Sequence, residues 1–227
     1  MPMRESRARP RWLPSARVMS RITRPLASNG AVLVGLAAAC AAVAASLVLV
    51  PDSRGLWAAG LAVLMVAIAV FDLRTFIIPD QLTAAAVVVG LAHAAADAPA
   101  AMLGAMEAAL VRGAAPALVF LAVRILYRRQ RGRDGIGLGD VKLAAAGGVW
   151  LNWVAIPIAV DIAALTALGA YLVFYLFPNL TPKSPGGQRR SLRTLRLPFG
   201  LFLAPAIWVA FIADATLMFD PFHPTAF

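Results

Sequence analysis

The sequence is poor in charged residues and has a single cysteine. Only 14% of its 227 residues are charged, whereas 61% are hydrophobic, and the mean hydropathy is +0.78. No soluble domain of this length needs so much apolar surface, so the composition predicts an integral membrane protein with several spans. Because Cys40 is alone, an internal disulfide and a cysteine-based zinc site are excluded.

Histidine and acidic residues are also scarce. The two histidines, His93 and His223, do not form a His-Glu-x-x-His motif, so a metalloprotease is unsupported and we expect neither a metal nor a cofactor. Lys and Arg number 21 against 11 Asp and Glu, which gives a net charge of +10. Such an excess can indicate nucleic-acid binding. Here the basic residues cluster between apolar runs, as in membrane topology, so no nucleic-acid partner is expected.

Long apolar runs predict helices that cross a bilayer. The first run, residues 30–50, contains no charge and would reach roughly 31 Å as a helix, which is a full crossing. Residues 100–112 are either an interfacial stretch or the beginning of a fourth helix. We therefore expect an all-α polytopic membrane bundle of about six or seven transmembrane helices, with further crossings over 55–72, 81–96, 113–127, 141–153, 154–177 and 199–219.

The basic residues predict the orientation of the chain. Residues 1–29 carry seven arginines and are expected to be a basic, disordered cytoplasmic tail, or one that binds anionic lipid. The transmembrane domain is predicted over 30–219, with 220–227 as a short outer tail. All basic residues except Arg54, Arg112 and Arg124 fall on segments predicted to share the side of the N-terminus, and Arg124 lies near that side. The N-terminus is therefore expected in the cytoplasm.

Two acids stand at the predicted inner edge of the membrane, where an acid is costly. Asp72 ends the second apolar run, and Asp140 precedes the fifth, directly after a segment with Gly135, Gly137 and Gly139. If the two helices are neighbours, the carboxylates can share a proton. One would then activate water while the other protonates the carbonyl and the leaving amine. The pair predicts aspartic-protease chemistry, and the glycines would let an extended substrate approach.

Structural roles compete with this interpretation. An acid before an apolar helix is most often an N-cap, and this alternative applies to Asp140 and to Asp80, which follows Pro79. Asp72 is harder to explain structurally, because the macrodipole at a helix C-terminus disfavours negative charge. Lys142, two residues after Asp140, either snorkels to the head groups or tunes the acid pair. Structural roles are expected for two further intramembrane acids, Asp161 and Asp214.

The order of these motifs resembles that of the type IV prepilin peptidases, which are polytopic inner-membrane aspartic proteases. The pattern runs from Asp72 through Pro79-Asp80 to Gly135-Ile136-Gly137-Leu138-Gly139-Asp140-Val141-Lys142-Leu143. Pro198-Phe199-Gly200 resembles an element near the C-terminus of that family, although Leu201 stands where many members have proline. The resemblance implies that Asp72 and Asp140 are the catalytic pair. It implies a supporting role for the other motif residues, Pro79, Asp80, Gly135, Gly137, Gly139 and Lys142.

The resemblance also implies a substrate and a location. Members of this family remove the basic leader of type IV prepilins or pseudopilins, cutting after a glycine at the cytoplasmic face of the bacterial inner membrane. The expected partners are therefore such a substrate and membrane lipids. Bifunctional members have paired Cys-x-x-Cys motifs and also methylate the new N-terminus. With one cysteine, this chain is expected to lack that activity, as in the short peptidases of tight-adherence (Flp) pili. The sequence does not indicate an oligomeric state.

Two alternatives stay open at this point. Other Gly-x-Gly-Asp intramembrane proteases, of the presenilin kind, need Pro-Ala-Leu after the second acid, but Pro116-Ala117-Leu118 precedes Asp140. A small transporter, or a pilus or secretion assembly factor without protease activity, would suit the intramembrane acids Asp161 and Asp214. Against the transporter, the polar features gather at one predicted face, and no inverted repeat is visible.

Overall fold

The computed structural model describes residues 29–132, 135–177 and 198–217. Within these residues the secondary structure is entirely helical, so the predicted all-α class is confirmed. The predicted basic tail, except residue 29, and the predicted outer tail lie outside the described residues. The helices are α2 (Asn29–Leu49), α3 (Ser53–Thr75), α4 (Asp80–Asp97), a short 3₁₀ helix η1 (Pro99–Ala101), α5 (Met102–Arg131), α6 (Leu138–Trp150), α7 (Ala155–Leu176) and α8 (Gly200–Leu217).

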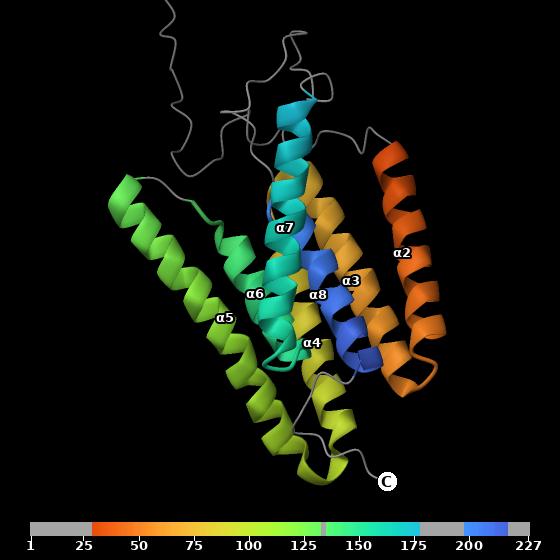
Figure 1. Ribbon diagram of the computed structural model, residues 1–227. Coiled ribbons are helices and arrows are strands. Elements are labelled where there is room, and N and C mark those ends of the chain that lie inside the picture. Colours follow the sequence, from red (N-terminus) through yellow and green to blue (C-terminus); the bar gives the residue numbers. More distant parts are fainter. Residues whose placement is uncertain (1–28, 133–134, 178–197, 218–227) are drawn as a thin grey trace, which may run out of the picture.

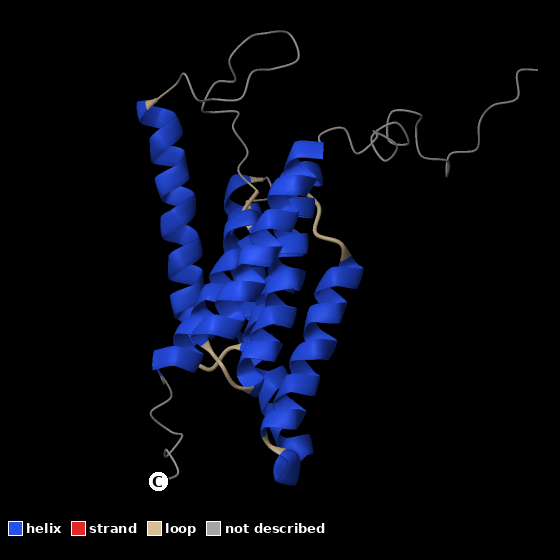
Figure 2. Ribbon diagram, turned by 90° about the vertical axis from the view of Figure 1, so that its right-hand side faces the viewer, coloured by secondary structure: helices blue, strands red, loops and turns tan. Residues whose placement is uncertain are grey.

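The helices form one bundle of alternating direction (Figures 1 and 2). In its interior, α8 packs against α3, α6 and α7, and α4 packs against α3, α5 and α6. Helix α2 lies at the edge and packs mainly on α3. The largest fully buried apolar side chains come from α3, α6 and its following turn, and α8; they are Leu61, Met65, Ile68, Leu143, Leu151, Leu203 and Ile207.

Five described helices are long and apolar enough to cross a membrane: α2, α3, η1 continued by α5, α7 and α8. Large apolar side chains point outward from them, among them Val34 of α2, which is 70% exposed, and Leu165 of α7, which is 67% exposed. Such surfaces are stable in lipid rather than in water. The bundle is therefore a polytopic membrane bundle, as predicted, although α4 and the 13-residue α6 are not among the five.

Two boundaries differ from the sequence-based expectation. Residues 102–131 form one helix of 30 residues, with Pro116 inside it, so the 100–112 stretch belongs to the fourth helix and is not interfacial. Helix α6 begins at Leu138 rather than at Val141, because Gly137 takes the N-cap position. Asp140 therefore lies inside the first turn of α6 instead of before the helix.

The direction of each helix defines two ends of the bundle. At one end α3 and α5 finish and α4, α6 and α8 begin, so Asp72 and Asp140 both belong to this end. We call it the site end. The opposite end contains the short connections from α2 to α3, from α4 to α5 and from α6 to α7.

Candidate active site

Asp72 lies in the last turn of α3 and is buried, with only 5% of its surface exposed. The helix stops four residues later at Phe76, whose left-handed backbone (φ 54°) lets its N–H donate to the Asp72 carbonyl at 2.9 Å. The Leu201 N–H, in the first turn of α8, donates to Asp72 Oδ2 at 3.0 Å. The positive end of α8 thus offsets the unfavourable position of this acid at the end of its own helix.

Gly200 makes this approach of α8 possible. A Cβ atom at Gly200 would lie 2.7 Å from Asp72 Oδ2 and 2.8 Å from Ile78 Cδ1, closer than real Cβ contacts. Any other residue here would therefore have to push one of these groups aside. This close approach gives a physical reason for glycine in the Pro198-Phe199-Gly200 element.

Asp140 is the third residue of α6, outside the five candidate spans. Its Oδ2 accepts a hydrogen bond from the Gly137 N–H at 3.2 Å, so it stabilises the start of α6 as the acidic half of a capping box does. The N-cap residue itself is Gly137, which corrects the N-cap alternative for Asp140. Burial raises the pKa of Asp140 to about 6; the Gly137 hydrogen bond opposes this shift, and the negative charge of Asp72 adds to it.

Elements other than their own helices bring the two acids to the same end, where the negative charge of Asp72 acts on Asp140. Helices α4 and α8 each pack against both α3 and α6. The buried side chain of Ile78, just before α4, fills the space between the two acid-bearing regions. A Cβ atom at Gly139 would lie 3.2 Å from Ile78 Cβ, and Ile78 also reaches Gly200. Ile78 and the Leu201 N–H were not predicted as parts of the site, because an apolar residue in a short loop and a backbone N–H give no local signal.

The motif glycines make room for the protein's own side chains. A Cβ atom at Gly135 would lie 2.6 Å from the Tyr127 ring of α5, and Gly139 faces Ile78. Neither glycine has a left-handed φ, so space rather than backbone freedom requires them. Arg124 of α5 also donates to the Ile136 carbonyl. The expectation that these glycines let an extended substrate approach the acids stays a prediction.

Asp80 does not cap α4, contrary to the sequence-based expectation. The N-cap is Pro79, which has no side-chain cap bond, and Asp80 is the first helical residue. Its Oδ1 instead lies 2.7 Å from Lys142 Nζ in α6, and both side chains are exposed. Lys142 thus links the first turns of α4 and α6, and among the described residues no ion pair joins it to Asp140.

The arrangement has the elements of acid–base chemistry. It holds one buried and one partly buried carboxyl group, each accepting a backbone N–H, at the same end of the bundle. A carboxyl group with a pKa near 6 can donate a proton near neutral pH, and a carboxylate nearby can accept one. In the described part of the chain, no three His, Cys, Asp or Glu side chains are grouped so that they could hold a metal ion.

Comparison with known proteins identifies the family. Residues 59–174, which include Asp72, Asp80 and Asp140, match the model of the "Type IV leader peptidase family". The "Prepilin leader peptidase/N-methyltransferase" of Burkholderia pseudomallei (strain 1026b) is 33% identical over 192 residues, which are 84% of this chain and 55% of that protein. The protein of the same name from Dickeya chrysanthemi is 36% identical over 138 residues, 57% of this chain and 47% of that protein.

A shorter relative matches over most of its length. "Leader peptidase HopD" of Salmonella typhimurium is 30% identical over 149 residues, which are 64% of this chain and 87% of that protein. By contrast, the chain spans about half the length of the two prepilin leader peptidase/N-methyltransferases. No solved structure matched. From the family match and the identity to these relatives, we conclude that the chain belongs to the type IV leader peptidase family.

Proposed function

We propose that this protein is an aspartic endopeptidase that removes the basic leader of type IV prepilins or pseudopilins by cutting after a glycine. The main support is that Asp72 and Asp140 lie at the same end of the bundle, inside the region that matches the family, and that the charge of Asp72 acts on Asp140. Each carboxyl group is oriented by a backbone N–H of a helix start, from α8 and from α6. This geometry suits a pair of acids with different proton affinities.

In the proposed mechanism, Asp72 is the base. The Leu201 N–H holds Asp72 Oδ2 at the start of α8. Asp72 takes a proton from a water molecule, whose oxygen attacks the carbonyl carbon of the leader's last glycine. Asp140, whose pKa is raised to about 6, donates to the carbonyl oxygen in its protonated form. When the carbon–nitrogen bond breaks, Asp72 gives its proton to the leaving amine, and Asp140 takes back its proton from the former carbonyl oxygen.

We place the site end at the cytoplasmic face of the bacterial inner membrane. Basic side chains of the described residues gather there, toward the ends of α3 and α5 and near the start of α6. They are Arg74, Arg124, Arg128, Arg129, Arg131 and Lys142. The opposite end has Arg54 and Arg112. Such a bias is typical of the cytoplasmic side, where a substrate keeps a basic leader.

Processing of a prepilin in membranes tests the peptidase proposal. The chain is expressed with a prepilin whose leader ends in glycine, and cleavage is followed by gel shift and by mass spectrometry of the new N-terminus. Wild type is expected to cut after the glycine. Asp72→Asn and Asp140→Asn are expected to lose about 100-fold or more of the cleavage rate at normal abundance. Asp214→Asn is the matched control, because the amide keeps an oxygen to accept the Asn152 hydrogen bond at the opposite end.

Two outcomes would contradict the proposal. If Asp72→Asn and Asp140→Asn cleave as fast as wild type, the acids are structural and another group performs the reaction. If wild type leaves the prepilin intact while a family member processes it in the same membranes, the substrate class is wrong. The same mass spectra test N-methylation, which we propose this chain does not perform, and a methylated product would refute that part.

A further inference from the structure

We propose that Asp80 is a binding site for a positively charged side chain of the leader. In the absence of substrate, the ammonium group of Lys142 occupies this site. This inference rests on the proposed function, because it assigns a subsite to the same substrate. It differs from the supporting role implied by the motif, since it makes Asp80 a specificity-determining residue with an ammonium or guanidinium group as its ligand.

The exposed Asp80–Lys142 ion pair allows another cation to replace Lys142 beside Asp80. Lys142 Nζ lies 2.7 Å from Asp80 Oδ1, yet the Lys142 side chain is 51% exposed and that of Asp80 is 73% exposed. An exposed ion pair contributes little net free energy, because water solvates both separated charges well. Replacing the ammonium group of Lys142 by another cation is therefore inexpensive, and Asp80 gains a partner either way.

The charge distribution singles out Asp80 at the site end. Of the described acids at this end, Asp72 is buried and Asp140 is partly buried, whereas Asp80 is exposed. Basic side chains of α3, α5 and α6 surround this end, so a basic leader is repelled over most of it. The other described acids lie toward the opposite end; they are Asp52, Asp97, Glu107, Asp161 and Asp214.

Asp80 is also close to Asp72 and Asp140 through two segments of the chain, the one before α4 and the start of α6. It follows Ile78 by two residues, and Ile78 contacts the backbone beside Asp140 and beside the α8 donor of Asp72. Lys142 follows Asp140 by two residues, in the same turn of α6. A leader that places a cation on Asp80 would therefore extend past these acids within a few residues.

A permanent clasp is the competing role for the same pair. If Asp80 and Lys142 only hold α6 against α4, removing either partner weakens the site equally, whatever the charge of the leader. If Lys142 is a placeholder, its removal frees Asp80 for substrate. The two roles thus predict opposite results for Lys142→Gln.

Binding of a synthetic leader peptide distinguishes these roles without requiring cleavage. The full chain carrying Asp72→Asn is placed in nanodiscs of neutral lipid, and a fluorescent basic leader is titrated by anisotropy. We expect Asp80→Asn to weaken binding roughly three- to tenfold, and Lys142→Gln to maintain or strengthen it. A leader with its lysine and arginine residues replaced by glutamine should bind weakly and show no dependence on Asp80.

Asp97→Asn is the matched control. Asp97 is the last residue of the same helix and forms an exposed ion pair with Arg54 at 3.6 Å, but at the opposite end. It should leave leader binding unchanged. The proposal is overturned if Asp80→Asn affects basic and neutral leaders equally or not at all, or if Lys142→Gln weakens binding as much as Asp80→Asn.

Cleavage assays in the otherwise wild-type chain separate this inference from the peptidase proposal. Asp80→Lys should restore cleavage of a leader whose basic residues are changed to glutamate. If the cleavage rate depends neither on Asp80 nor on the charge of the leader, the Asp80 subsite is refuted and the peptidase proposal is kept. If a prepilin binds in an Asp80-dependent manner but is never cleaved, the peptidase proposal is refuted and the binding site is kept.

Discussion

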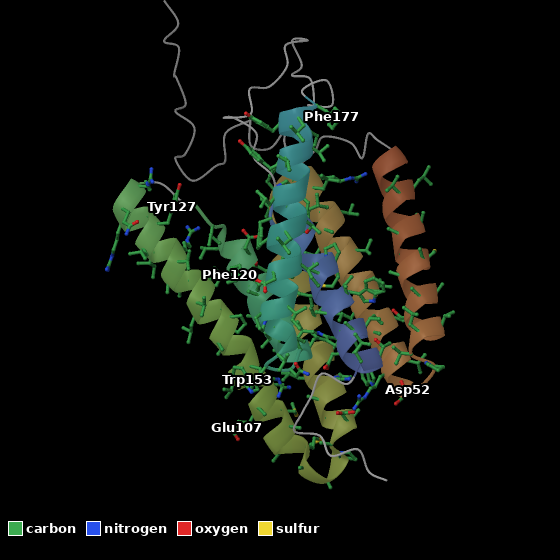
Figure 3. All side chains as sticks on the ribbon, viewed as in Figure 1. Asp52, Glu107, Phe120, Tyr127, Trp153 and Phe177 are labelled. Atoms are coloured by element: carbon green, nitrogen blue, oxygen red, sulfur yellow. The ribbon has the colours of Figure 1, made fainter. Side chains whose placement is uncertain are left out.

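The two ends of the bundle use polar side chains in different ways. At the opposite end, Asp214 Oδ1 accepts from the Asn152 side-chain amide at 2.6 Å, and Asp97 pairs with Arg54. Figure 3 shows Asp52, Glu107 and Trp153 toward that end, with Tyr127 and Phe177 toward the site end. At the site end, Asp72 and Asp140 accept from backbone N–H groups, and only the exposed Asp80 has an ion pair, with Lys142, among the described residues.

This difference separates acids that hold the structure from acids that are available for chemistry. An amide or guanidinium side chain satisfies a carboxylate in a fixed geometry and favours one protonation state. Backbone N–H groups orient a carboxyl group without adding a full positive charge beside it. In the described residues, no ion pair joins Asp72 or Asp140 to Lys or Arg. A proton can therefore pass between such groups and a substrate.

The largest effect that would test this contrast is expected from Gly200→Ala. The added methyl group would meet Asp72 Oδ2 at 2.7 Å and Ile78 Cδ1 at 2.8 Å, so Asp72 must move from the Leu201 N–H. A displacement of about 1 Å in a catalytic group can cost about 100-fold in rate. We expect a loss of that order in the cleavage rate at unchanged KM, measured on purified protein with a prepilin.

Gly60→Ala is the control for this substitution. Gly60 lies on α3, the same helix as Asp72, and a Cβ atom there would meet nothing within 4 Å. It should cleave as wild type does. Normal cleavage by Gly200→Ala as well would show that Asp72 need not keep its contact with the start of α8.

A smaller effect concerns the electrostatic coupling of the two acids. Because the negative charge of Asp72 contributes to the raised pKa of Asp140, Asp72→Asn should move that pKa below about 6. Burial is the larger cause and remains, so the pKa should stay above the ordinary value of 3.8. At a pH near 6, Asp140 in the variant is then less protonated than in wild type. Titration of ¹³C-labelled aspartate by NMR measures the shift, and an unchanged or raised pKa would refute the coupling.

The smallest effect is expected at the opposite end and on stability alone. Asn152 Oδ1 accepts from the Val154 and Ala155 N–H groups at 3.0 and 2.7 Å, and its amide donates to Asp214. Asn152→Ala should lower the free energy of unfolding by about 1–2 kcal/mol, as for a lost helix cap. Cleavage per folded molecule should not change. Thermal unfolding in detergent measures the loss, which a tenfold fall in cleavage rate would contradict.

Thr166→Ala provides the comparison for that stability loss. Thr166 is exposed on α7, and its hydroxyl donates only to carbonyls of its own helix, at 2.7 and 3.1 Å. Its removal should shift the unfolding temperature far less than Asn152→Ala. Equal shifts would mean that Asn152 does not stabilise the α6–α7 connection.

The features that could be predicted from the sequence are those that depend on residues close together in the chain. Apolar runs predicted the helices because a run placed in lipid or in the protein interior must satisfy its backbone hydrogen bonds within itself. The motif spacing singled out Asp72 and Asp140. The start of α6 was misplaced because Gly137 caps it through its backbone, and Asp80 was misassigned because its partner Lys142 is 62 residues away. Likewise, the Leu201–Asp72 bond spans 129 residues, so it follows from packing and not from any local signal.

The shortness of α6 has a consequence for the supply of water. Its 13 residues rise only about 20 Å, against a hydrocarbon layer of about 30 Å. Figure 1 shows α6 beginning well below the level at which α5 and α7 end. Helix α6 packs against α4, α5 and α8, so these neighbours, and not lipid alone, surround its short length. In the proposed reaction, we therefore expect water to pass the ends of α5 and α7 before it reaches Asp140 in the first turn of α6.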